Sequence, residues 1–263
     1  MKPVFLILIL YYALLGNVFS QQTDTVNITD KAGFKQGHWI KKYPNGNIQY
    51  DGYFSNNNPS GQFKRYYETG KIQSILEFSD DGSEAQATFF HPNGFVASKG
   101  TYVNQIREGK WQFFSAVIED YLLCEEYYVN NKKQGKSVKY YPDKSLLEEV
   151  SYSNDVKNGT WIQYYPDGRI CLRANYTDGR LEGRFEVFHA NGSPQYLGQY
   201  KDDAREGTWI LYNEDGSVKH EIDYKQGAAT NPELYKEASD YLDALEKNKG
   251  KIADPEITGT IWN

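Results

Sequence analysis

The chain has 263 residues, a formal net charge of −6 and a hydrophobic content of only 39%. The negative charge argues against nucleic acid or an anionic membrane surface as the main partner, because both repel an acidic protein. Aromatic residues reach 16%, with 23 tyrosines. A chain poor in aliphatic and rich in aromatic side chains favours a thin, half-buried β-sheet over a thick core.

The first twenty residues have the layout of a secretory signal peptide. Lys2 precedes a mostly apolar segment over residues 3–15, and Val18-Phe19-Ser20 places small or aliphatic residues at a cleavage site. The apolar segment is shorter than the roughly twenty residues of a membrane span. We therefore expect a signal peptide over 1–20 and an exported chain, periplasmic, cell-surface or secreted, with no integral membrane span after cleavage. An uncleaved membrane anchor is the alternative.

After an N-terminal linker over 21–29, residues 30–227 repeat one pattern about every 24 residues. Counted from a glycine at position zero, the copies start at Gly37, Gly61, Ala85, Gly109, Gly135, Gly159, Gly183 and Gly207. Position +2 is Trp or Phe in most copies, and positions +8 and +9 are mostly Asn-Gly or Asp-Gly. The fourth copy has a two-residue insertion between Ser115 and Tyr121, and when later positions are counted without it, position +17 is aromatic in every copy.

Asn-Gly and Asp-Gly between two aromatic-rich segments indicate a β-hairpin, and hairpins joined by short turns become antiparallel neighbours. One hairpin is marginally stable alone, so each copy needs its neighbours. The sequence therefore predicts an all-β fold, an elongated single-layer antiparallel β-meander of about eight 24-residue hairpin repeats.

The motif Gly-x-Trp-x-x-Tyr-Tyr-Pro-Asp/Asn-Gly is clearest at residues 159–168 and, in part, at 207–216. It resembles the MORN-repeat-variant family, whose bacterial members are often labelled YwqK-type antitoxins. The resemblance covers roughly residues 30–227, and it implies an open β-meander, contacts with proteins or lipids, and no catalytic residues. Copies three and four depart from the motif, since Ala85 replaces the first glycine and an insertion before Tyr121 replaces the turn.

Residues 228–263 do not follow the repeat. Asn231 is a suitable helix N-cap and Pro232 a suitable first helical residue. Apolar side chains then recur at helical spacing: Leu234, Ala238, Tyr241, Leu242 and Leu245. We expect a C-terminal capping helix that covers the last hairpin, followed by an extended tail. A partner-binding helix is the alternative.

Strand alternation assigns the positions of each hairpin to two faces. If the Asn/Asp-Gly loop has two residues, +6 lies opposite +11 and +2 opposite +15. Positions +2, +4, +6, +11, +13, +15 and +17 then form an apolar face, and +3, +5, +12, +14 and +16 a mostly polar one. Position +5 places aromatic rings on the polar face, which makes this row the candidate partner-binding site: Tyr66, Phe90, Phe114, Tyr140, Tyr164, Phe188 and Tyr212. Packing as cross-strand aromatic pairs is the alternative.

No set of residues predicts catalysis or a bound cofactor. His91 and His189 lie four copies apart, and no histidine spacing indicates a metal site. Glutamates at −1 beside arginines at −2 recur in several copies, which is typical of a solvated row of charges. Cys124 and Cys171 fall two copies apart at +13 and +12, on different faces, so we expect two free thiols rather than a disulfide.

These observations favour an exported, non-catalytic repeat scaffold that binds another protein. A cell-surface glycan- or wall-binding protein is one alternative, because the aromatic-rich repeats also resemble choline- and glucan-binding repeats. An antitoxin or immunity protein is another, supported by the family label alone. An enzyme is the least favoured class.

Overall fold

The computed structural model describes residues 25–230, together with Lys236 and Asp240. The expected signal peptide lies outside these residues. The expected capping helix also lies outside them apart from those two positions, so it has no support from the structure.

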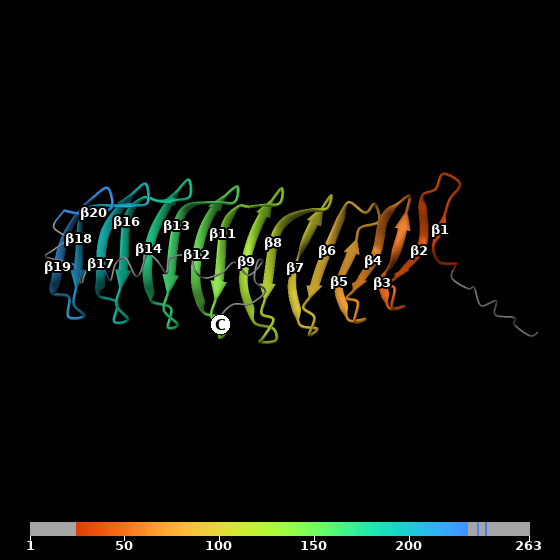
Figure 1. Cartoon of the computed structure of the whole chain (residues 1–263), viewed down its shortest axis with the longest axis horizontal. Helices are drawn as coiled ribbons and strands as arrows, with labels where there is room; N and C mark the ends of the chain where they lie inside the picture. The colour runs from red at the N-terminus through yellow and green to blue at the C-terminus, as the bar shows by residue number, and fades with distance from the viewer. Residues whose placement is uncertain (1–24, 231–235, 237–239, 241–263) are drawn as a thin grey trace, which may run out of the picture.

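Twenty antiparallel strands form one sheet in which every pairing joins near neighbours in the chain (Figure 1). The first and last strands lie at opposite ends of the long axis, so the sheet is open. An elongated antiparallel meander is therefore confirmed. The strands are β1 (Ile28–Thr29), β2 (Lys35–Lys42), β3 (Ile48–Ser55), β4 (Asn58–Tyr66), β5 (Ile72–Phe78), β6 (Glu84–Phe90), β7 (Val96–Val103), β8 (Ile106–Phe114), β9 (Leu122–Val129), β10 (Lys132–Lys133), β11 (Gly135–Tyr140), β12 (Leu146–Ser153), β13 (Val156–Tyr164), β14 (Ile170–Thr177), β15 (Arg180–Leu181), β16 (Gly183–Phe188), β17 (Pro194–Lys201), β18 (Ala204–Tyr212), β19 (Val218–Lys225) and β20 (Ala228–Ala229).

Two kinds of turn alternate along the sheet, and the Asn/Asp-Gly loop is one residue longer than the two-residue loop assumed from the sequence. In the Asp-Gly turn, Gly168 N–H donates to the Tyr165 carbonyl at 2.8 Å and Tyr165 N–H to the Arg169 carbonyl at 2.8 Å, while Gly168 has φ 84°. This is a three-residue loop with glycine in the left-handed region. The two-residue turn follows position +17 instead, where Asn154 and Asp155 both have positive φ, 50° and 69°.

The longer loop shifts the register near the turn. Trp161 lies opposite Ala174, as predicted for +2 and +15, but Tyr164 lies opposite Ile170, and Cys171 is the extra residue of a β-bulge. The predicted pairing of +6 with +11 is therefore wrong, because the loop takes one residue more than a two-residue turn. Position +11 faces the same side as +5, and it leaves the apolar face to which we assigned it.

The other side of the sheet, which we call the aromatic core face, is built from positions +2, +13, +15 and +17. Trp161 is only 5% exposed, and its ring centroid lies 5.6 Å from that of Tyr176 and 6.5 Å from that of Phe185 in the next copy. Trp209 packs in the same way against Tyr200 and Tyr224. Adjacent hairpins thus share one layer of interlocking rings, which stabilises the meander without a second sheet.

Candidate protein-binding face

The register shift creates a two-residue-wide apolar stripe on the face opposite the aromatic core. Each aromatic side chain at +5 lies directly across from an aliphatic side chain at +11, for example Tyr66 from Ile72 and Tyr212 from Val218. We call these two rows the outer stripe: Tyr66, Phe90, Phe114, Tyr140, Tyr164, Phe188 and Tyr212 at +5, with Ile72, Val96, Leu122, Leu146, Ile170, Pro194 and Val218 at +11.

The aromatic members of the outer stripe are all half-buried. Two aliphatic members are exposed, Ile72 at 36% and Val218 at 52%. The +5 row lies on the face predicted from strand alternation, whereas the aliphatic row was not expected there, because only the bulge brings +11 to the same side.

Charged side chains at +14 lie between successive rings in the middle of the stripe, whereas Ile75 and Leu197 occupy this position in the second and seventh copies. The Tyr140 hydroxyl donates to Glu125 Oε2 at 3.0 Å, and the Tyr164 hydroxyl donates to Glu149 Oε2 at 3.1 Å. Lys99 Nζ lies 5.7 Å from the centroid of the Phe114 ring. Burial, together with the hydrogen bond to Glu125, raises the pKa of Tyr140 to about 12.

Rings of the +5 row do not stack on one another anywhere in residues 25–230. Phe114, Tyr140 and Tyr164 each contact a charged side chain of the preceding hairpin instead. In its central part the outer stripe therefore presents aromatic and charged groups alternately, and its role in binding stays a prediction.

Position +6 carries a second row, on the other side of the sheet, that joins each hairpin to the next. The Tyr67 hydroxyl donates to the Phe90 carbonyl at 2.7 Å, and the Tyr141 hydroxyl donates to the Tyr164 carbonyl at 2.8 Å. His91 Nε2 lies 3.1 Å from the Phe114 carbonyl and His189 Nε2 lies 3.2 Å from the Tyr212 carbonyl. These histidines therefore take the place of tyrosine in linking one hairpin to the next, and their contacts do not indicate a catalytic or metal-binding role.

The basic residues at −2 are not a solvated row of charges. Arg205 is 4% exposed, and its guanidinium lies 5.8 Å from the Trp209 ring centroid and 4.9 Å from that of Tyr224. Arg107 lies 4.1 Å from the Tyr128 ring centroid. Such cation–π contacts stabilise a ring and a cation together, so these arginines belong to the aromatic core face.

The acidic residues at −1 hold the two-residue turns. Glu108 Oε2 accepts the backbone N–H of Asn130 at 2.9 Å, and Glu206 Oε2 accepts that of Gln226 at 2.8 Å. Each acceptor reaches the turn that ends the same hairpin. The acid is therefore a turn-stabilising residue, as a repeated position suggests, and not a general acid.

The two cysteines are free, as predicted. Cys124 is buried on the aromatic core face, where it was expected. Cys171 was assigned to the other face, and this is wrong, because the bulge turns it toward the cluster around Trp161. Burial raises the pKa of the Cys171 thiol to about 11, so it is a poor nucleophile.

Within the described residues, no group of three or more His, Cys, Asp or Glu side chains is arranged to hold a metal ion. His38 Nε2 lies 2.7 Å from Asp51 Oδ1, an isolated pair on the outer face. No helix in the part of the chain that the structure describes is long and apolar enough to cross a membrane.

A family model described as MORN repeat variant matches six segments of the chain: residues 35–56, 59–80, 133–154, 157–178, 181–202 and 205–226. A search of the curated proteins finds no match. The unmatched residues 81–132 include the copy with Ala85 at position zero and the insertion before Tyr121. Since the six segments cover half of the sequence and each coincides with one hairpin unit of the sheet, this chain belongs to the MORN repeat variant family.

Proposed function

We propose that the chain is an exported, non-catalytic scaffold that binds another protein through its outer stripe. MORN repeats are commonly protein- or membrane-binding modules, and the net charge of −6 favours a protein over an anionic membrane. The single observation that supports the proposal is the outer stripe itself, which places aromatic and aliphatic side chains along the whole array on a face with no core of its own.

The composition of the stripe suits an interface. Aromatic side chains supply most of the binding energy at protein interfaces. The carboxylates of Glu125 and Glu149 and the ammonium of Lys99 lie between the rings. Charges placed in this way fix the register of a partner more than its affinity. A sheet held by hydrogen bonds between consecutive hairpins also loses little conformational entropy on binding.

A paired-variant experiment tests the role of the stripe. The partner is captured from the native extracytoplasmic fraction with the wild-type chain, identified, and titrated by calorimetry. We expect Tyr140→Ala with Tyr164→Ala to weaken binding by more than about 2 kcal/mol, because both rings lie at the centre of the stripe. The matched control is Lys136→Ala with Thr160→Ala, which changes exposed +1 residues of the same face in the same two copies.

The proposal is wrong if the tyrosine pair changes affinity no more than the control pair. Export is tested separately by mass spectrometry of the native protein. An N-terminus at Gln21 supports it, whereas an intact Met1 contradicts it.

A further inference from the structure

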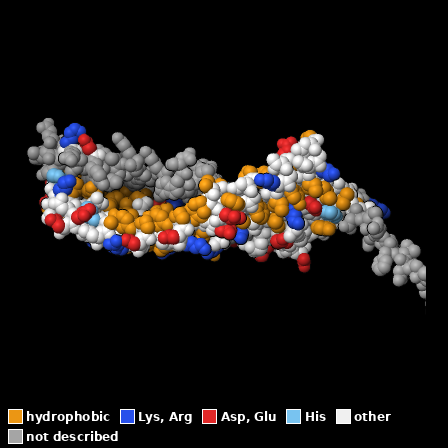
Figure 2. Space-filling model, turned by 90° about the horizontal axis from the view of Figure 1, so that it is seen from below, with side chains coloured by type: hydrophobic (Ala, Val, Ile, Leu, Met, Phe, Trp, Pro, Cys, Tyr) orange, Lys and Arg blue, Asp and Glu red, His pale blue; other side chains and the backbone are white. Residues whose placement is uncertain are grey.

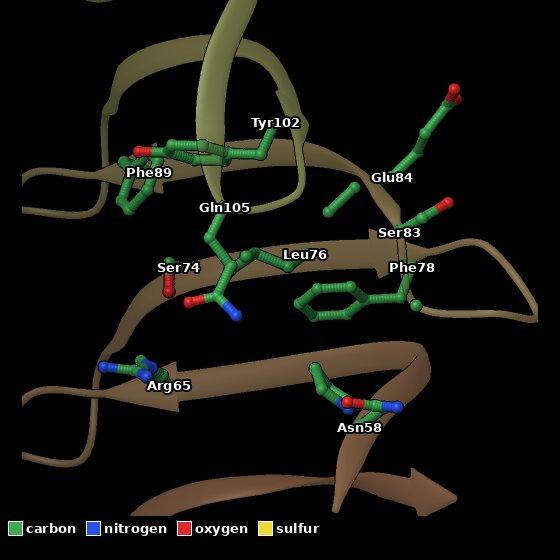
Figure 3. A pocket seen from close by; sticks show the side chains of 13 residues that line it. Asn58, Arg65, Ser74, Leu76, Phe78, Ser83, Glu84, Phe89, Tyr102 and Gln105 are labelled. Carbon is green, nitrogen blue, oxygen red and sulfur yellow. The ribbon is translucent and has the colours of Figure 1, made fainter. Parts of the chain in front are cut away.

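A pocket of about 430 Å³ opens on the aromatic core face over strands β4 to β7 (Figure 3). Its size falls within the roughly 300–1,000 Å³ typical of small-molecule sites. The wall contains three aromatic rings, Phe78, Phe89 and Tyr102, together with Leu76. Its polar side chains are Asn58, Arg65, Ser74, Ser83, Glu84 and Gln105. It lies at the boundary between the second and third copies, and it has no counterpart in the sequence analysis.

The pocket lies beside a position where the repeat lacks its ring. In the next copy, the Trp111 indole at +2 lies directly over Gly100 on the neighbouring strand. A Cβ built on that glycine would be 2.2 Å from the indole, so only glycine leaves room for the ring there. In the third copy Ala87 takes the place of the ring and Leu76 lies across from it. Leucine fills part of the space of an indole, and the remaining space opens toward Phe78 and Tyr102.

One end of the pocket is polar and contains a buried hydroxyl without a hydrogen-bond partner. Ser74 lies directly across from Arg65 on the neighbouring strand, and Figure 3 shows both on the same side of the pocket. The Ser74 side chain is 1% exposed, and its Oγ has no hydrogen-bond partner. A buried hydroxyl without a partner is unfavourable, so it indicates a bound group that completes it.

Arg65 supplies a positive charge at the same end. Its guanidinium lies 6.0 Å from the centroid of the Phe63 ring. Among the described residues it has no carboxylate partner within ion-pair distance. Glu84 also lines the pocket, but its side chain extends away from Arg65 at the other end (Figure 3).

We propose that this pocket binds a small aromatic carboxylate. The ring of the ligand contacts Phe78, Phe89 and Tyr102 in the space next to Ala87, and its carboxylate accepts hydrogen bonds from the Arg65 guanidinium and the Ser74 hydroxyl. A guanidinium binds a carboxylate through short charge-assisted hydrogen bonds. This site lies on the opposite face of the sheet from the outer stripe, and it does not depend on the protein-binding proposal.

Titration of the full mature chain with phenylacetate and 3-phenylpropionate tests the inference, with phenylacetamide and acetate as the neutral and ring-free comparisons. Binding is followed by NMR shifts of the Phe89 and Tyr102 side chains and by calorimetry. We expect saturable binding of the two aromatic carboxylates and binding at least roughly tenfold weaker for both comparison compounds. If neither aromatic carboxylate shifts these resonances, or if phenylacetamide binds equally well, the inference is wrong.

Arg65→Gln tests the charged end. This side chain is exposed, so the substitution leaves the core intact. We expect it to weaken the aromatic carboxylates roughly tenfold and to leave phenylacetamide unchanged. The matched control is Arg169→Gln, an exposed arginine in the turn of another copy. Equal effects of the two substitutions would overturn the assignment of Arg65.

A second variant tests whether the ligand occupies the space left by the ring that is missing at Ala87. Leu76→Gly with Ala87→Trp restores the glycine–tryptophan pair that Gly100 and Trp111 form in the next copy. The indole then occupies part of the pocket, and we expect binding of phenylacetate to be lost in a folded protein. Unchanged binding by the folded double variant would exclude this pocket as the site. If the double variant does not fold, the Arg65 comparison decides the question alone.

Discussion

In three copies a ring at +2 lies over a glycine at +15 of the preceding copy. Phe63, Trp111 and Trp209 each lie over a glycine whose added Cβ would be 2.1–2.2 Å from the ring. Where leucine replaces this glycine, at Leu76, the facing residue is Ala87. In these copies the ring leaves no volume for a side chain on the neighbouring strand, so the ring and the glycine form one unit. Trp161 lies across from Val150 instead, so a ring at +2 does not require a glycine in every copy.

Gly198→Ala tests this unit. Its added methyl group would overlap the Trp209 indole, which is fully buried and has no space into which to move. We expect a loss of about 1–3 kcal/mol in the free energy of unfolding, measured by urea denaturation. Lys201→Ala, an exposed position on the same strand, is the control, and equal effects of the two variants would contradict the argument.

Trp161→Ala and Tyr164→Ala test the two faces. Trp161 is almost fully buried and its Nε1–H donates to Glu148 Oε2 at 3.1 Å, whereas Tyr164 is half-buried on the outer stripe. Loss of a buried tryptophan ring costs about 3–5 kcal/mol. Thermal melting should therefore show a clearly larger decrease for Trp161→Ala. A larger decrease for Tyr164→Ala would mean that the faces are assigned wrongly.

At the scale of the hairpin, two neighbouring tyrosines perform different tasks. Tyr66 at +5 lies on the outer stripe, and within the described residues its hydroxyl makes no hydrogen bond. Tyr67 at +6 lies on the other side and donates to the Phe90 carbonyl of the next hairpin. The Tyr-Tyr pair thus combines one residue on the outer stripe with one whose hydroxyl bonds to the next hairpin.

Tyr67→Phe and Tyr66→Phe separate these tasks in a matched pair, since each removes one hydroxyl. Tyr67→Phe breaks the hydrogen bond to the Phe90 carbonyl, and we expect a loss of about 1 kcal/mol in the free energy of unfolding. Tyr66→Phe should leave this free energy nearly unchanged. Chemical denaturation of the two variants side by side measures both values, and equal losses would argue against a linking role for +6.

At the scale of the whole molecule, most of the buried rings belong to two separate clusters along the array. One surrounds Trp111 and the other runs from Val150 to Tyr224. Between them, Ser137 stands at +2 in place of a ring, and the buried carboxylate of Glu126 pairs with Lys133 at 2.6 Å. Figure 2 shows hydrophobic side chains in a band along the molecule, with charged side chains at its margin.

The array contains many tyrosines, so its stability should decrease in alkaline solution. Burial raises the pKa of several tyrosines above 10.0, and it raises that of Tyr140, together with the Glu125 hydrogen bond, to about 12. A raised pKa in the folded state means that the unfolded chain loses these protons first. The contribution of these tyrosines to the free energy of unfolding should therefore be constant below pH about 9 and decrease as the pH rises from about 10 to 12.

Urea denaturation at successive pH values measures this decrease. Tyr140→Phe should make the dependence less steep, because it removes a tyrosine whose pKa is clearly raised in the folded state. An unfolding free energy that does not change up to pH 12 would contradict the prediction.

The sequence by itself determined the repeat, its period, the meander and the +2/+15 pairing. These depend on contacts within one hairpin or between adjacent hairpins, where turn residues and strand alternation are sufficient. The two free cysteines also followed from the period, because residues two copies apart cannot approach each other in a meander.

Only the tertiary structure decided where the bulge falls. One extra residue in the Asp-Gly loop moves every later side chain of the strand to the opposite face until the bulge compensates. For this reason the +11 row and Cys171 were assigned to the wrong faces, although +5, +13 and +15 were assigned correctly. Contacts between neighbouring copies likewise decided the buried arginines at −2 and the pocket beside Ala87. Such features depend on which side chains meet across strands, and the pattern of a single copy does not contain that information.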